Sequence, residues 1–194
     1  MIEENIIAIE EAKYSVVAKD GAIEIRDYSP LILAEVVVEA SQEKAGNIAF
    51  RRLFKYITGQ NQSRVQIAMT APVSVEYNSA QIAMTAPVSQ QRTPKGFAVA
   101  FTMPSSFTIE TIPSPNDPTI SLRLVPARRM AAIRYSGFWS EKRYQQYKAK
   151  LEQWLKEKGL KAIGEPVWAR YNSPFALWFL RRNEVLFAIE MKHG

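Results

Sequence analysis

The sequence predicts an α+β domain built from two similar halves that share one sheet. Helices are expected in both halves, because Ser41 and Ser140 can each cap a helix N-terminus and Gly59 and Gly159 can each end a helix with a left-handed residue. Strand-like segments precede and follow each helix, so the order strand, strand, helix, strand, strand occurs twice. A helix buries one stripe and a sheet one face, so we expect one curved antiparallel or mixed sheet with both helices against it.

The first half, about residues 14–103, is expected to begin with a β-hairpin formed by Ile23–Arg26 and Leu31–Val38. After the helix, a methionine-containing segment and the strand Phe97–Met103 complete this half. Each strand is rich in apolar and β-branched residues, which favour a half-buried pleated surface.

The helix of the first half carries an apolar residue on its polar side. At 100° per residue, Phe54 falls among Arg51, Lys55 and Thr58, with Ile48 at the edge. One interpretation is an exposed aromatic residue or a contact with a loop. The other is a shallow apolar groove rimmed by guanidinium and ammonium groups, which would suit a flat aromatic ligand with carboxylate tails.

The methionine-containing segment holds an exact duplication. Gln66–Ser74 and Gln81–Ser89 are identical at all positions, so either copy could fill the same place in a sheet. One interpretation is a long hairpin that the fold tolerates. The other is that both copies line one site and deliver Met69 and Met84, since methionine adapts to a flat ligand, although it also fills gaps in cores.

The second half, about residues 118–192, follows an extended proline-rich connector, Pro104–Pro118. It repeats the expected order of the first half, with a hairpin before the helix and two strands after it. The strands expected here are Ile120–Arg123, Met130–Tyr135, Val167–Tyr171 and Val185–Met191.

Composition excludes several kinds of chemistry. The chain has 194 residues, 47% of them apolar, no cysteine and one histidine, His193, so disulfides, thiolate metal sites and histidine-based catalysis are not expected. The net charge of +6 is scattered and accompanies no nucleic-acid motif, which favours a small anionic ligand as partner. Neither a membrane-spanning run nor a signal peptide is recognisable, and we expect a cytoplasmic protein.

Several motifs together resemble the SOUL haem-binding protein family, in the right order from about Tyr14 to Met191. The resemblance implies one domain over residues 1–194, folded as a distorted β-barrel of two pseudosymmetric ββαββ halves flanked by two helices. It also implies haem or another tetrapyrrole as a non-covalent ligand, and a carrier, buffer or sensor rather than a catalyst. The motifs are Ala49–Gly59, both copies of Ile-Ala-Met-Thr-Ala-Pro-Val, Leu124–Gly137, Gly164–Tyr171 and Arg181–Val185.

The resemblance also implies where a tetrapyrrole would lie, namely beside the first helix and a loop of the second half. Some family members ligate iron through histidine, but His193 lies outside every motif, so no metal ligand is assigned and only a methionine remains a candidate. The apolar loop 173–181 is either a wall of the groove or a buried strand. The implied binding residues are Arg51, Phe54, Lys55, Met69, Met84, Phe175, Leu177 and Arg181.

Two other classes of function stay open. Similar two-repeat folds resemble GyrI-like small-molecule-binding proteins and hydrolases, in which Glu190 on the last strand would be a crevice carboxylate and general base. The other interpretation of Glu190 is an outward-facing strand residue. An interaction module is a further alternative, indicated by Phe54 and the Phe175–Leu180 loop.

Overall fold

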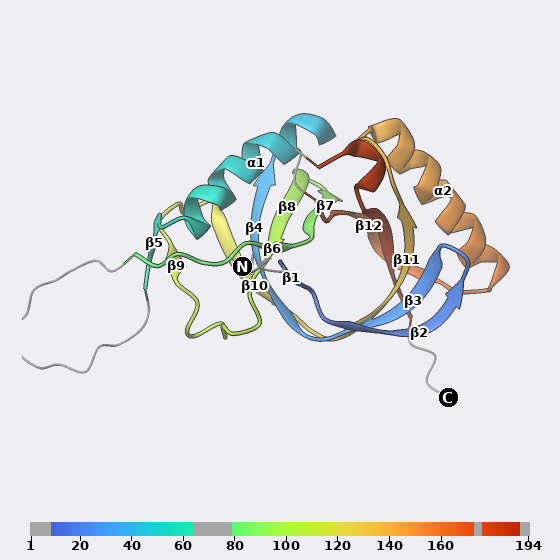
Figure 1. Ribbon diagram of the computed structural model, residues 1–194, viewed down its shortest axis with the longest axis horizontal. Helices are drawn as coiled ribbons and strands as arrows, with labels where there is room; N and C mark the ends of the chain where they lie inside the picture. The colour runs from blue at the N-terminus through green and yellow to red at the C-terminus, as the bar shows by residue number, and fades with distance from the viewer. Residues whose placement is uncertain (1–8, 64–78, 173–175, 191–194) are drawn as a thin grey trace, which may run out of the picture.

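The computed structural model describes residues 9–63, 79–172 and 176–190. These residues form an α+β fold in which a nine-stranded antiparallel sheet curves strongly and two helices lie on its outer side (Figure 1). The strand order is β10-β4-β8-β7-β12-β13-β11-β3-β2, and two short additional ladders join β1 to β6 and β5 to β9. The elements are β1 Glu10–Glu11, β2 Tyr14–Asp20, β3 Ile23–Tyr28, β4 Leu31–Val38, α1 Gln42–Ile57, β5 Asn61–Gln62, β6 Thr85–Ala86, β7 Val88–Thr93, β8 Gly96–Thr102, β9 Ser114–Pro115, β10 Ile120–Val125, β11 Arg128–Tyr135, α2 Glu141–Glu157, β12 Ala162–Arg170, the 3₁₀ turn η1 Trp178–Leu180 and β13 Asn183–Ile189.

Both predicted helices are confirmed. The Ser140 hydroxyl accepts a hydrogen bond from the Arg143 backbone N–H at 3.4 Å, as expected of a helix cap. Ser41 has the extended backbone of a cap, but its side chain makes no capping bond, so this detail of the prediction is wrong. Helix α1 packs against β4 and β8, and α2 packs against β11, β12 and β13.

The predicted hairpins before the two helices are wrong. Strand β3 pairs with β11 and β2, whereas β4 pairs with β10 and β8. Tyr28 lies opposite Arg128 and Leu31 lies opposite Val125, so the β3–β11 and β4–β10 ladders continue in one register. The segments β3–β4 and β10–β11 are therefore two long antiparallel segments that pair with each other. They connect the α1 side of the molecule to the α2 side.

Proline explains why these segments cross the molecule and do not turn back. A two-residue hairpin loop requires positive φ, which favours glycine or asparagine, whereas Pro30 and Pro126 hold φ near −65°. Among the described residues, only glycines have positive φ. The chain consequently stays extended at both connections.

Strand pairing does not close the sheet into the expected barrel. The end strands of the ladder order are β10 and β2, and they do not pair with each other among the described residues. The inner side of the curved sheet is nevertheless a separate apolar surface, on which Tyr28, Met130 and Leu186 are buried.

The second copy of the duplicated block is part of the fold, whereas the first copy lies outside the described residues. Ile82 is buried in the core beneath α1, and its backbone N–H donates to the Ile57 carbonyl at 2.8 Å. The block continues into β6 and β7, and β7 lies between β8 and β12 at the centre of the sheet.

Candidate functional site

The predicted residues of α1 lie on its outer side. Arg51 and Lys55 are exposed, and Phe54 is 44% exposed. The Phe54 ring stacks on Phe50 with 5.9 Å between centroids, and Phe50 meets Phe101 of the core edge-on at 5.3 Å. Phe54 is thus the outer end of an aromatic series that begins in the core beneath α1.

Of the other predicted site residues, some lie in the part of the chain that the structure describes and some do not. Met84 is 37% exposed and lies just before β6. Leu177 and Arg181 flank the 3₁₀ turn η1. Met69 and Phe175 lie outside the described residues, so their placement as site residues stays a prediction.

The loop around η1 lies beside the N-terminal part of α1. Arg181 and Arg170 both lie over the Trp139 ring, with guanidinium carbons 4.9 Å and 5.4 Å from its centroid. The Arg170 guanidinium also approaches α1 at Gly46, where an added Cβ would lie 3.1 Å from Nη2. Phe54 lies about 12 Å farther along the helix axis, at 1.5 Å per residue. The structure therefore places the predicted residues on two surfaces.

The larger of these surfaces is aromatic. Phe138 and the four residues Leu177–Leu180, which we call the aromatic surface, are each 50–64% exposed. Phe138 and Trp178 stack at 5.2 Å with an interplanar angle of 12°, and Trp178 meets Phe179 edge-on at 5.6 Å. The Arg181 guanidinium lies 5.9 Å from the Phe138 ring, so a cation borders the apolar rings. The interpretation of this loop as a buried strand is wrong.

Sequence reasoning missed Phe138. It lies on the connection between β11 and α2, which shows no periodicity that would indicate contact with a loop forty residues later. The only available indication was its position next to the Leu124–Gly137 motif.

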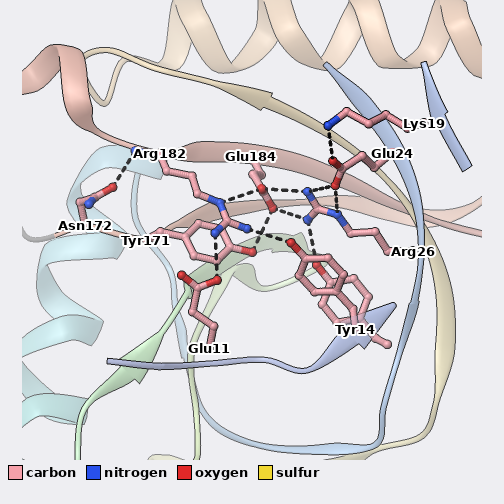
Figure 2. Close-up of polar contacts among 10 residues, drawn as sticks. Glu11, Tyr14, Lys19, Glu24, Arg26, Tyr171, Asn172, Arg182 and Glu184 are labelled. Carbon is pink, nitrogen blue, oxygen red and sulfur yellow. Dashed lines mark hydrogen bonds and ion pairs between the residues drawn. The ribbon is translucent and has the colours of Figure 1, made fainter. Parts of the chain in front are cut away.

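Sequence reasoning also missed a buried ion network on the inner side of the sheet, which Figure 2 shows around Glu184. The Glu184 side chain has no exposed surface, and Arg26 contacts it through both terminal nitrogens, at 2.7 Å and 3.0 Å. Arg182 Nε and the Tyr171 hydroxyl each donate to the same carboxylate at 2.9 Å. Strand alternation puts Glu184 on the inner side, because Val185 packs toward α2.

The ion network extends to the first described residues of the chain. Arg26 Nε donates to Glu24 at 2.8 Å, and Arg182 Nη1 donates to Glu11 at 2.9 Å (Figure 2). The network therefore links β1, β3 and β13. Burial alone would raise the pKa of Glu184, but the hydrogen bonds and charge of Arg26, and then those of Arg182, hold it below its usual value.

Glu184 is not suited to act as a general base. An ionised carboxylate has about four lone-pair positions, and four hydrogen bonds already occupy those of Glu184. Its lowered pKa makes it a weak proton acceptor as well. The arrangement indicates a structural cross-link.

Glu190, the carboxylate proposed for a hydrolase-like crevice, faces outward. Its side chain is 56% exposed and forms an ion pair with Lys161 Nζ at 3.2 Å. Of the two interpretations of Glu190, the exposure of its side chain supports the outward-facing residue and not the crevice carboxylate. The residue lies just after the end of β13, where the last strand leaves the sheet.

A cavity of about 310 Å³ has none of the predicted site residues in its lining, although Thr85, the residue after Met84, is part of the lining. Its lining combines the carboxylates of Glu10 and Glu11 with apolar side chains that include Leu31, Phe107 and Leu124. This volume is at the lower end of the range for small-molecule sites.

The described residues provide neither a metal-binding cluster nor a membrane-spanning helix. They contain no group of three or more His, Cys, Asp or Glu side chains that could hold a metal ion. Within the same part of the chain, no helix is both long enough and apolar enough to cross a membrane.

The fold is similar to solved structures of very different sequence. The C-terminal domain of EcmrR superposes with a TM-score of 0.52 at 13% identity, covering 91% of this chain and 98% of that domain. A hydrolase from Listeria innocua superposes with a TM-score of 0.53 at 10% identity, covering 90% of this chain and 94% of the hydrolase. These likenesses define a shared two-helix, curved-sheet fold.

Comparison of the sequence with known proteins identifies the family. The model of the SOUL heme-binding protein family matches residues 9–188, and the chain belongs to this family. It is similar to Heme-binding protein 2 of Mus musculus, 28% identical over 179 residues, and to Heme-binding protein 2 of Homo sapiens, 27% identical over 176 residues. Each match covers 84% of this chain and 80% of the relative.

Proposed function

We propose that this protein binds haem or another tetrapyrrole non-covalently and serves as a carrier, buffer or sensor without catalysing a reaction. The observation that carries the proposal is the aromatic surface bordered by Arg181, in a chain of the SOUL family. Stacked, exposed rings suit the flat face of a macrocycle, and a guanidinium suits its carboxylate tails.

The expected affinity is modest. Covering roughly 300 Å² of apolar macrocycle at about 25 cal/mol/Å² contributes about 7–8 kcal/mol. Association costs several kcal/mol of this, and one or two charge-assisted hydrogen bonds restore roughly 2–6 kcal/mol. A Kd in the micromolar range follows.

We also propose that the domain consists of two structurally related halves. The continuous register of the β3–β11 and β4–β10 ladders supports a pseudo-twofold axis near Pro30 and Pro126. The placement of one helix on each side of the central β7–β12 pair supports the same axis. Such symmetry would give a distorted barrel within one domain.

A pair of matched variants distinguishes the aromatic surface from the surface around Phe54. Leu177→Ser with Trp178→Ser removes exposed apolar contacts, so we expect tetrapyrrole affinity to fall at least tenfold. Phe54→Ser should change it less than twofold. Both variants should melt near the wild-type temperature, because the replaced side chains are exposed. Titration by Soret absorbance measures the affinities. A large loss in Phe54→Ser with none in the double variant would move the site to the outer side of α1, where Arg51 and Lys55 lie.

The second candidate function is binding of a different small molecule, as in GyrI-like proteins. The cavity of about 310 Å³ beside Glu10 and Glu11 favours it. A hydrolase has no such support, because Glu190 is exposed and Glu184 is fully hydrogen-bonded.

A further inference from the structure

Six buried polar side-chain atoms of the described residues form no hydrogen bond of regular geometry, and all six belong to one cluster. Two of them lie next to each other, because the Trp168 indole N–H acts as a hydrogen-bond donor to the Tyr135 hydroxyl. We call this cluster the donor cluster. Its centre is a row across three neighbouring strands, in which Asn183 of β13 lies opposite Tyr135 of β11 on one side and Arg170 of β12 on the other. The six atoms are Tyr135 Oη, Trp139 Nε1, Arg143 Nε, Trp168 Nε1, Arg170 Nε and Asn183 Oδ1.

Short contacts hold the other members of the donor cluster to this row. The Arg170 guanidinium lies 5.1 Å from the centre of the Trp168 ring and 5.4 Å from that of Trp139. Asn183 Nδ2 donates to the Gly137 carbonyl at 3.1 Å, and an added Cβ at Gly137 would lie 3.0 Å from the guanidinium carbon of Arg143. The donor cluster therefore lies where α2 begins, on the helix side of the sheet.

The donor cluster consists mostly of hydrogen-bond donors. Arginine and tryptophan nitrogens only donate hydrogen bonds, so four of the six atoms are N–H groups. The Trp168 N–H has the Tyr135 hydroxyl as its acceptor, whereas those of Trp139, Arg143 and Arg170 require one. Leaving a buried donor without an acceptor costs about 1–3 kcal/mol, and folded proteins hold few such groups. Three such N–H groups in one place indicate a missing partner with several acceptor lone pairs.

The donor cluster also lacks negative charge. Arg143 donates to the Ser136 carbonyl and Arg170 donates to the Gln90 side chain, and neither has a carboxylate within ion-pair distance among the described residues. In the buried ion network, by contrast, Arg26 and Arg182 both contact Glu184. Burial lowers the pKa of Arg170 to about 10, which reflects a cation without compensation.

The donor cluster borders the aromatic surface. Trp139, Arg143 and Arg170 are only partly buried, and Trp139 directly follows Phe138 in the chain. Arg181 and Arg170 lie over the same Trp139 ring, at 4.9 Å and 5.4 Å. The Trp139 ring thus connects Arg170 of the donor cluster with Arg181 at the aromatic surface.

We propose that the donor cluster binds the carboxylate tail of a planar ligand whose flat part lies on the aromatic surface. This proposal rests on the proposed tetrapyrrole-binding function and assigns the polar end of that site. Two carboxylate oxygens offer the lone pairs that the arginine and tryptophan N–H groups need, and the negative charge compensates Arg143 and Arg170.

The test compares deuteroporphyrin with its dimethyl ester, which keeps the flat ring and removes both negative charges. Binding is measured by porphyrin fluorescence on the wild type, on Arg170→Met and on a matched control, Arg134→Met, an exposed arginine one residue before Tyr135 on the opposite side of β11. We expect Arg170→Met to weaken the diacid roughly tenfold or more and to leave the ester unchanged. The control should leave both unchanged.

The melting temperature of the ligand-free protein shows whether Arg170 has a ligand-binding role or a structural one. Removing an uncompensated buried cation should leave the melting temperature of Arg170→Met equal to or above that of the wild type. A lower melting temperature together with equal losses for diacid and ester would show that Arg170 only supports the fold, and would overturn the proposal.

A third ligand, benzoate, tests carboxylate binding by the donor cluster even if no porphyrin binds. Sodium benzoate should raise the melting temperature of the wild type but not that of Arg170→Met. If neither porphyrin binds while benzoate acts in this way, the tetrapyrrole function fails and the carboxylate site stands. If benzoate has no effect and the diacid binds no better than the ester, the donor cluster holds only water and the proposal is wrong.

Discussion

At the scale of single residues, Glu184 and Arg170 show two different ways in which a buried charge is held. Glu184 accepts four hydrogen bonds and is compensated by two arginines, whereas Arg170 is partly buried between two tryptophans without a carboxylate. The first arrangement cross-links strands. The second indicates a place for an anion from outside the described residues.

Replacing Glu184 should be costly because it leaves Arg26 buried without its main partner. We expect Glu184→Gln to lower the free energy of unfolding by about 3–5 kcal/mol at pH 7, measured by urea denaturation. The folded-state pKa of Glu184 is lowered from 4.5, so its contribution is present above about pH 4.5 and is lost as the pH falls through the lower value. The wild type should therefore lose this stability in acid, whereas the variant has none to lose.

Glu190→Gln is the control for this prediction, because Glu190 is an exposed carboxylate at the other end of β13. It should unfold like the wild type at pH 7. Equal stability of Glu184→Gln and Glu190→Gln would show that the ion network does not support the fold.

At the scale of elements, the duplicated block shows how one copy can be sufficient for a strand. The second copy supplies the buried Ile82 and leads into β6 and β7, and Asn61 holds its start through hydrogen bonds with the backbone of Ala80 at 2.8 Å and 3.0 Å. These two bonds involve backbone atoms, which any residue in this position would provide.

Deleting residues 66–80 should therefore leave a folded protein. The deletion puts Val65 in the chain position of Ala80, directly before the retained copy. We expect one cooperative thermal transition, with a melting temperature within about 8 °C of the wild type, equivalent to a few kcal/mol at most for a chain of this size. Loss of the cooperative transition would mean that the first copy also has a structural role.

At the scale of the whole molecule, the loop around η1 lies near the starts of both helices (Figure 1). The donor cluster lies next to this loop, on the neighbouring strands β12, β13 and β11. The chain contains one histidine, His193, which lies outside the described residues and outside this region of the sequence. Binding at the aromatic surface would depend on the ring and its carboxylates.

We therefore predict that haem and iron-free protoporphyrin bind with affinities within threefold of each other. The physical reason is that both present the same flat ring and the same propionates to the aromatic surface. Parallel titrations measure this, and His193→Ala should leave the haem absorption spectrum unchanged. A strong preference for haem that disappears in His193→Ala, Met69→Leu or Met84→Leu would instead identify an iron ligand.

Local sequence patterns determined the two helices, most strands and the family of this protein, because caps, alternation and motifs depend on residues a few positions apart. Only the tertiary structure decided that β3 and β4 cross between the two sides of the sheet, since strand partners lie far away in the chain. The same holds for the candidate site. Sequence reasoning proposed Leu177 and Arg181, but only the fold brings Phe138 against Trp178, buries the carboxylate of Glu184, and gathers Tyr135, Arg170 and Asn183 into one row.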